Sequence, residues 1–323
     1  MEVKTQLLSI IERARKFKAS DIHFVMKQDQ MLVQFRVGQL MLHDQVLEMK
    51  DYQHMLAFIK FQASLTLSHP KQPQSGLLMM CNEEQAYHCR VSILPTYHYQ
   101  SLVMRLIYDD HLKQIDEIPY FPQNADLLKE MVSSAAGLVL ISGPTGSGKT
   151  TTTYALIDYL KQQLGKSIVT IEDPVEYHQP DLVQMQVNES AGMTYDIGIK
   201  EMLRHDPDVI VIGEIRDSAT AAHALRAAFT GHLVISTLHA KNISGTINRL
   251  LDLGMSLHDL QHAVIGIANQ RLIKKDDQSK ALFEILFGRD LEEWFQFYQN
   301  NHQKQLKYRQ LSDEFLECEQ KSS

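Results

Sequence analysis

The chain of 323 residues predicts an α/β protein, with a core built on a mainly parallel sheet and a smaller α+β N-terminal domain before it. From Asn124 onward, short apolar runs alternate with helical segments, which is typical of a doubly wound sheet. The segment before residue 110 instead mixes two helices with several strands. We therefore predict an N-terminal domain over 1–107, a linker over 108–123 and the core, with a helical tail, over 124–323.

The elements of the N-terminal domain follow from apolar periodicity. An amphipathic helix opens the chain, with apolar residues at 7, 8, 10, 11 and 14. A second helix is predicted over 51–65, and strands over 22–26, 31–37, 77–80, 87–94 and 102–107. The linker is predicted from Asp109-Asp110, Pro119 and Pro122.

The elements of the core are read in the same way. Strands are predicted over 138–142, 167–171, 209–212 and 233–238, with a later one over 281–286. A helix over 151–164 presents Tyr154, Ile157, Leu160 and Leu164 on one face. Residues after Gly288 are predicted to form a polar helical tail.

Between the first core strand and this helix, residues 143–150 read Gly-Pro-Thr-Gly-Ser-Gly-Lys-Thr. This Gly-x-x-x-x-Gly-Lys-Thr pattern is a phosphate loop, in which backbone N–H groups and a helix N-terminus hold an anion. ATP is the expected ligand, bound by Gly143, Pro144, Thr145, Gly146, Ser147, Gly148, Lys149, Thr150 and Thr151. Lys149 can reach the β- and γ-phosphates, and the Thr150 hydroxyl can hold Mg²⁺. The alternative is a glycine-rich turn that binds nothing, which the strand–loop–helix order disfavours.

Ligands of such sheets bind beyond the carboxyl ends of the strands, so the residues after each strand are candidates for catalysis. Glu214 follows the strand over 209–212 and is the candidate for polarising the attacking water, or for binding Mg²⁺ through a water. Its alternative role is that of a helix N-terminal carboxylate. Glu172, Asp173 and Glu176 form an acidic cluster that either positions water or Mg²⁺, with Glu172 favoured, or is a solvated loop.

Histidines and arginines give further candidates. His232 and His239 flank one strand at an odd separation, which places them on opposite faces and disfavours a shared metal. His239 lies at the strand end, where it can sense a γ-phosphate, while His232 follows Gly231 at a helix exit and is better explained as a helix cap. Arg90 and Arg105, on predicted strands, either pair with carboxylates or reach the nucleotide of a neighbouring subunit.

The bulk properties exclude several classes of protein. The net charge of −7 disfavours broad nucleic-acid binding, so no direct nucleic-acid partner is expected. No apolar run approaches a membrane span, and the N-terminus lacks the apolar segment of a signal peptide, so we expect a cytoplasmic protein. Three scattered cysteines, Cys81, Cys89 and Cys318, disfavour a disulfide scaffold or a zinc site.

Taken together, the motifs resemble those of the type II secretion and type IV pilus ATPases. The resemblance is carried by the phosphate loop, the acidic box 170–177, the Walker B region 204–217 and the histidine box 230–239, with Ala19–His23 and Arg90–Ser92 matching the N-terminal domain. It implies a RecA-like P-loop core that uses ATP and Mg²⁺, and a ring-shaped homo-oligomer, usually a hexamer. It also implies a place on the cytoplasmic face of the membrane, working with a polytopic platform protein.

The resemblance also implies roles for single residues. Glu214 supports hydrolysis, Glu172 and Glu176 belong to the acidic box, and His232 and His239 form the histidine pair. The candidates for contacts across subunits are Arg90, Arg105 and Arg216.

Several sequence features of other family members are missing here, and they indicate which kind of secretion or pilus ATPase the chain resembles. The chain is short, has no four-cysteine insertion after Gln270-Arg271-Leu272, and shows no retraction-type motif over 281–297. It therefore resembles the ATPase that assembles the competence pseudopilus for DNA uptake in Gram-positive bacteria. The alternatives are a pilus retraction ATPase, a nucleic-acid translocase, which predicts DNA-stimulated activity, and a nucleotide-binding regulator without turnover. As a hypothesis of mechanism, we expect hydrolysis to change the angle between the two domains across the 108–123 linker.

Overall fold

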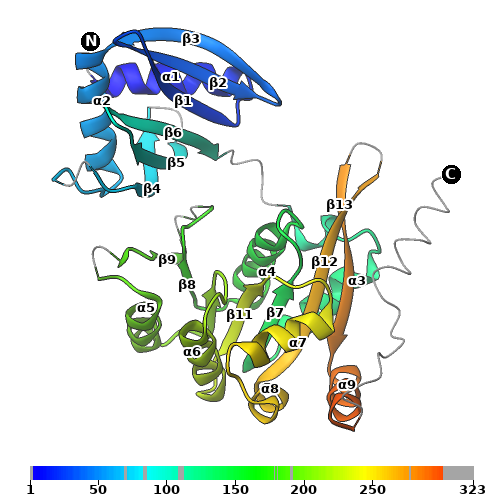
Figure 1. Cartoon of the computed structure of the whole chain (residues 1–323). Helices are drawn as coiled ribbons and strands as arrows, with labels where there is room; N and C mark the ends of the chain where they lie inside the picture. Colours follow the sequence, from blue (N-terminus) through cyan, green and yellow to red (C-terminus); the bar gives the residue numbers. More distant parts are fainter. Residues whose placement is uncertain are drawn as a thin grey trace. The chain divides into compact units, whose positions relative to one another are not determined.

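The computed structural model describes residues 3–68, 71–82, 86–107, 113–177, 179, 181–189, 192–275 and 278–300. The chain divides into two compact units (Figure 1). The first comprises Met1–Asp110 together with Glu176–His178, and the second comprises His111–Val175 with Gln179–Ser323. Each unit has its own sheet.

The first unit is an antiparallel sheet with two helices packed on one face. The strand order is β3-β2-β1-β6-β5-β4. The strands are β1 Asp21–Lys27, β2 Gln30–Val37, β3 Leu40–Glu48, β4 Gln74–Cys81, β5 Ala86–Pro95 and β6 Gln100–Ile107. Helices α1 (Val3–Lys16) and α2 (Met49–Gln62) bury Ile11 and Met55 against alternate strand residues such as Phe24 and Phe35. The α+β pattern predicted for this segment is present, with one additional edge strand, β3, whose residues are mostly exposed or half-buried.

The second unit carries a seven-stranded sheet in the order β13-β12-β7-β11-β10-β8-β9. The strands are β7 Gly137–Ser142, β8 Ile168–Glu172, β9 Val183–Gln186, β10 Val209–Ile212, β11 Leu233–Leu238, β12 Val264–Lys275 and β13 Gln278–Phe287. Neighbouring strands from β12 to β9 pair in parallel, and only β12–β13 is antiparallel among the described pairs. The strands predicted over 138–142, 167–171, 209–212, 233–238 and 281–286 correspond to β7, β8, β10, β11 and part of β13.

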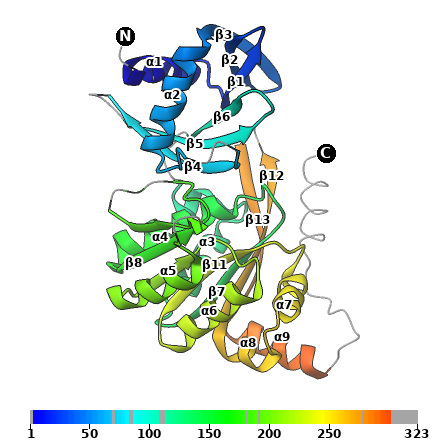
Figure 2. The ribbon, with the colours of Figure 1, turned by 60° about the vertical axis from the view of Figure 1, so that its left-hand side comes forward.

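Helices lie on both faces of this sheet (Figure 2). They bury the central strands from both sides, so every residue of β7 is buried. Leu138 and Leu140 of β7 share an apolar cluster with α5 to α9, while Val139 and Ile141, which point the other way, are equally buried. The helices are α3 Gln123–Val132, α4 Lys149–Leu164, α5 Tyr195–Met202, α6 Ser218–Phe229, α7 Ile243–Asp252, α8 Leu257–Ala263 and α9 Arg289–Asn300, with short 3₁₀ turns η1 at Ile115–Glu117 and η3 at Leu203–His205. On the predicted face of α4, Tyr154, Ile157 and Leu160 are buried but Leu164 is exposed.

Part of the predicted linker is built into the second unit. Ile115 and Ile118 are buried, and the backbone around Pro119 pairs with Ala281 of β13. Residues 108–112, including Asp109-Asp110, lie outside the described residues, as do Cys318 and the tail beyond residue 300. Among the helices described, none is long and apolar enough to cross a membrane. The described cysteines, Cys81 and Cys89, are free thiols.

Candidate active site

The glycine-rich loop lies between the end of β7 and the start of α4, as predicted. Gly143, Gly146 and Gly148 all have positive φ angles, of 152°, 76° and 84°, which other residues rarely adopt. A Cβ at Gly143 would lie 2.4 Å from the carbonyl oxygen of Gln270, so the loop also lacks room for a side chain there. These glycines allow the tight turns by which the loop backbone reaches the N-terminus of α4.

Lys149, the first residue of α4, turns its side chain back over the loop. Its Nζ donates to the carbonyl oxygens of Gly143 and Pro144, at 3.0 Å each, and lies 3.4 Å from Nδ1 of His239. The side chain is buried. Thr150 and Thr151, the next residues of α4, are half-buried. The ammonium group is therefore fixed over the loop.

A second strand, β12, supports the loop from the side. The fully buried Gln270 donates from Nε2 to the Ser147 carbonyl at 2.7 Å and accepts from the Thr152 hydroxyl at 2.9 Å. Its neighbour Asn269 donates to the Ser142 hydroxyl at 2.9 Å. The sequence predicts neither β12 nor a role for Gln270, whose only signal is its place in the Gln270-Arg271-Leu272 segment.

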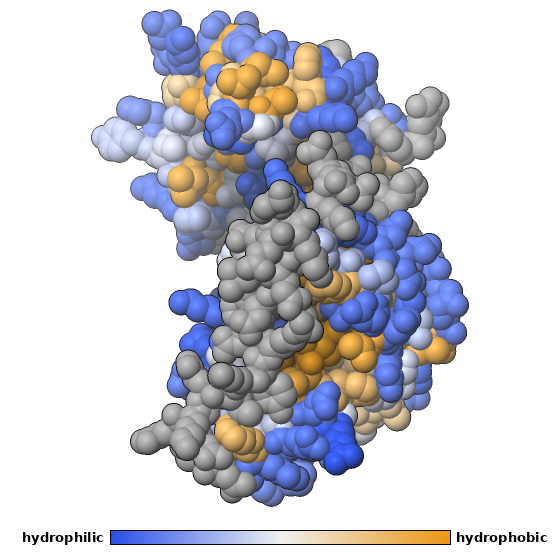
Figure 3. All heavy atoms as spheres, turned by 90° about the vertical axis from the view of Figure 1, so that its right-hand side faces the viewer, coloured by the Kyte–Doolittle hydropathy of each residue, from blue (hydrophilic) through white to orange (hydrophobic). Residues whose placement is uncertain are grey.

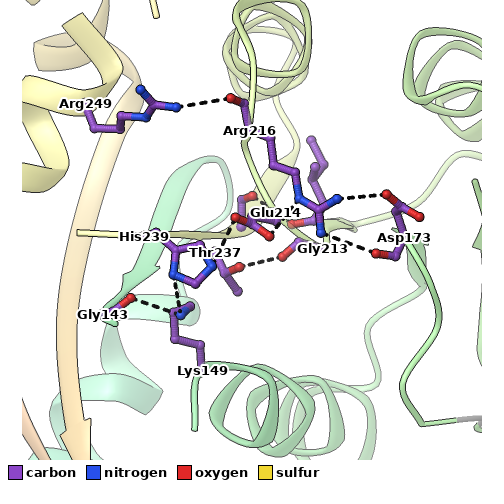
Figure 4. A network of polar contacts seen from close by, with 11 residues as sticks. Gly143, Lys149, Asp173, Gly213, Glu214, Arg216, Thr237, His239 and Arg249 are labelled. Atoms are coloured by element: carbon purple, nitrogen blue, oxygen red, sulfur yellow. Dashed lines mark hydrogen bonds and ion pairs between the residues drawn. The ribbon is translucent and has the colours of Figure 1, made fainter. Parts of the chain in front are cut away.

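Glu214 lies directly beyond β10, at the edge of the sheet where the loop also lies (Figure 4). Its Oε1 is 3.3 Å from Nε2 of His239, and its Oε2 accepts from Nε of Arg216 at 2.9 Å. Since His239 also contacts Lys149, the histidine bridges the loop lysine and the carboxylate. The structure thus brings together Lys149, His239 and Glu214, all singled out in the sequence.

Arg216 links two carboxylates of this site. Besides Glu214, it donates to Oδ2 of Asp173 at 2.9 Å. Its hydrogen bond with Glu214 raises the pKa of Arg216 above the ordinary value, although burial opposes this. Arg216 therefore stays positively charged, and the two carboxylates that it contacts belong to the same chain.

Glu172 has a different environment from the one expected of a water-positioning group. It is 6% exposed, and both carboxylate oxygens accept from the Tyr154 hydroxyl at 2.8 Å. Oε1 also accepts from Thr170 at 2.8 Å. These contacts tie α4 to β8 inside the fold. The preference for Glu172 over its acidic neighbours is not supported by this geometry.

Of the other predicted residues, His232 lies away from the loop. His232 lies before β11, at the strand's opposite end from His239, where its ring contacts the Thr230 hydroxyl. This local contact fits a helix cap. Arg90 on β5 and Arg105 on β6 belong to the first unit, and Arg105 pairs with Asp21 at 2.8 Å. Glu176 is exposed and is grouped with the first unit.

The strand order, the loop and the residues beyond the strands define the class of this protein, a P-loop ATPase. Within the described residues, no group of three or more His, Cys, Asp or Glu side chains forms a metal site.

The chain belongs to the type II/IV secretion system protein family, which it matches over residues 2–321. It is 37% identical over 312 residues to competence protein ComGA of Bacillus subtilis (strain 168), covering 91% of this chain and 88% of that protein. Competence protein ComGA of Halalkalibacterium halodurans is 36% identical over 310 residues, covering 90% and 89%. Among solved structures, the pilus retraction motor PilT with bound ADP superposes with a TM-score of 0.74 at 27% identity, covering 92% of this chain and 89% of that one.

Proposed function

We propose that this chain is the motor ATPase that drives assembly of a competence pseudopilus for DNA uptake. The observation that carries the proposal is the bridge from Lys149 through His239 to Glu214 at the carboxyl ends of the parallel strands. The similarity to two competence proteins, across about nine-tenths of the chain, supports the particular system served.

The loop fits a triphosphate. Gly143 has no space for a Cβ, and the Ser147 hydroxyl is buried with no hydrogen-bond partner among the described residues. Such a cradle, with the N-terminus of α4 and the Lys149 ammonium, matches the negative charge of the β- and γ-phosphates. In this RecA-like core, Gly143 to Thr151 bind ATP.

Oxygen donors near the loop fit Mg²⁺. The hydroxyl of Thr150 is the direct candidate, and Glu214 is the candidate that acts through a water. When bound, Mg²⁺ supplies charge neutralisation at the phosphate oxygens. Glu214 orients the attacking water, and His239 connects its carboxylate to the lysine that reads the γ-phosphate. Arg216 balances the negative charge of Glu214 and Asp173.

We propose that the chain acts as a homo-oligomer, a hexamer, on the cytoplasmic face of the membrane with a polytopic platform protein. Figure 3 shows apolar side chains at the surface of the first unit. Exposed apolar residues there include Val25, Leu40, Met41 and Val46, on strands β1 and β3. Surfaces of this kind support contacts between protein chains. Arg90, Arg105 and Glu176 are proposed to act at such contacts, with hydrolysis changing the angle between the domains.

The function is tested in competent cells of the source bacterium that carry Glu214→Gln in place of the wild-type chain. An assembly motor predicts loss of both surface pseudopilin and DNA uptake, at normal protein level. Accumulation of extended filaments would instead indicate a retraction motor, which the likeness to PilT makes the second candidate. Unchanged uptake would contradict both.

A further inference from the structure

Thr237 lies one residue before the end of β11 and holds the backbone on both sides of Glu214. It is 7% exposed, and its hydroxyl donates to the carbonyl oxygen of Gly213 at 2.7 Å. Its own carbonyl oxygen accepts from the backbone N–H of Ile215 at 3.0 Å. A single threonine therefore fixes the chain immediately before and immediately after the proposed catalytic carboxylate.

The hydroxyl bond lies where the regular pairing of the two strands ends. The last paired residues of β10 and β11 are Ile212 and Ser236. Gly213 comes next, and without a Cβ its backbone dihedral angles are less restricted than those of other residues. Threonine is branched at Cβ, so its hydroxyl keeps a defined direction. The bond from Thr237 therefore limits rotation of the peptide that joins Gly213 to Glu214.

The same segment of chain also contacts the carboxylate of Glu214. His239 follows two residues after Thr237, and its Nε2 lies 3.3 Å from Oε1 of Glu214. Its Nδ1 lies 3.4 Å from Nζ of Lys149. Figure 4 shows Thr237 directed at Gly213, beside the histidine that contacts the carboxylate. A rotation of the peptide before Glu214 would therefore move its carboxylate relative to His239.

We propose that Thr237 is a positioning residue for hydrolysis: its hydroxyl sets the orientation of the peptide before Glu214, and so places that carboxylate against His239 and the attacking water. The inference rests on the proposed ATPase function. The hydroxyl bonds to the Glu214 segment rather than to the glycine-rich loop, so its loss should slow turnover without weakening the binding of ATP.

The test is steady-state ATP hydrolysis by the full-length chain with Thr237→Val, which replaces the hydroxyl with a methyl group of similar size. We expect kcat to fall at least about tenfold, because small displacements of a catalytic group are costly, with KM for ATP within about twofold of wild type. Thr237→Ser keeps the hydroxyl and should hold kcat within about threefold of wild type.

The matched control is Ser236→Ala, one residue earlier on the same strand. The buried Ser236 hydroxyl donates to the carbonyl oxygen of Ile212, also at 2.7 Å, but inside the paired part of the strands. Ser236→Ala and Thr237→Val each remove one such bond, so both should lower the thermal midpoint by similar amounts. Only Thr237→Val should lower kcat per folded molecule.

A second pair, Thr237→Ala and Thr237→Ser, differs by the hydroxyl alone and repeats the comparison if the valine variant does not fold. A wild-type kcat without the hydroxyl, an equal fall of kcat in Ser236→Ala, or a serine variant as slow as the variants lacking the hydroxyl would each overturn the inference. These results leave the proposed function standing, since the wild-type chain turns over in all of them. A wild-type chain that does not hydrolyse ATP contradicts the proposed function, and the inference with it.

Discussion

At the scale of single residues, the surroundings of Glu172 and Glu214 separate two carboxylates that look alike in the sequence. Both directly follow, or end, a buried parallel strand. The carboxylate of Glu172 accepts hydrogen bonds from hydroxyl groups inside the fold. The carboxylate of Glu214 instead contacts His239 and Arg216 at the sheet edge. The sequence could predict that both lie near the loop, but not which hydroxyl groups contact one of them, because Tyr154 reads only as part of an apolar helix face and Thr170 only as part of a buried strand.

This difference predicts that Glu172→Gln harms stability more than chemistry. The amide removes the negative charge that strengthens both hydroxyl hydrogen bonds and replaces one acceptor oxygen with an N–H₂ donor, so we expect a loss of about 1–3 kcal/mol of unfolding free energy. ATP turnover per folded molecule should stay within a few-fold of wild type. Urea denaturation and ATPase assays on the same samples check this. If turnover falls as far as in Glu214→Gln while stability is unchanged, Glu172 is a catalytic group after all.

At the scale of elements, the strands that carry the motif residues could be predicted and the supporting strand could not. The runs that became β7, β8, β10 and β11 are short and apolar, as expected of strands buried on both faces. Strand β12 interrupts its apolar residues with Asn269, Gln270 and Arg271, so its sequence does not read as a core strand. The polar residues are tolerated because Asn269 and Gln270 find partners in the loop and β7.

The role of β12 predicts that Gln270→Ala weakens nucleotide binding. Without the bond to the Ser147 carbonyl, the loop loses its lateral support, and the Thr152 hydroxyl loses its acceptor. We expect KM for ATP to rise several-fold, with a loss of about 1–3 kcal/mol in stability. Gln163→Ala, an exposed glutamine on α4, is the control and should change neither. An unaltered KM in Gln270→Ala would show that the loop holds its shape without β12.

In the first unit, Asp21 joins β1 to β6 through Arg105. Burial acts to raise the pKa of Asp21, but hydrogen bonds from Ser20 and Arg105 outweigh it, and the pKa lies below the ordinary value. A lowered carboxyl pKa contributes stability above the unfolded pKa of about 4, and that contribution is lost as pH falls through the folded pKa.

Asp21→Asn should therefore be less stable than wild type near pH 7, by about 1 kcal/mol since Arg105 is largely exposed. The difference should shrink as pH falls below about 4. Urea denaturation of both chains across this range measures it. A difference that is constant with pH would mean that the charge of Asp21 plays no part.

At the scale of the whole molecule, a parallel sheet, a phosphate loop and membership of a secretion ATPase family together support one claim, that the chain is a motor driven by ATP hydrolysis at Glu214. The claim predicts an assembly that hydrolyses ATP without needing DNA, consistent with a net charge of −7.

The most direct test is ATP turnover by purified wild type and Glu214→Gln, with binding of a fluorescent ATP analogue and light scattering on the same samples, with and without DNA. The account predicts a hexamer-sized particle with slow, DNA-independent turnover, and a variant that binds nucleotide normally but turns over at least about a hundredfold more slowly. Equal turnover by Glu214→Gln, or strong stimulation by DNA, would contradict it.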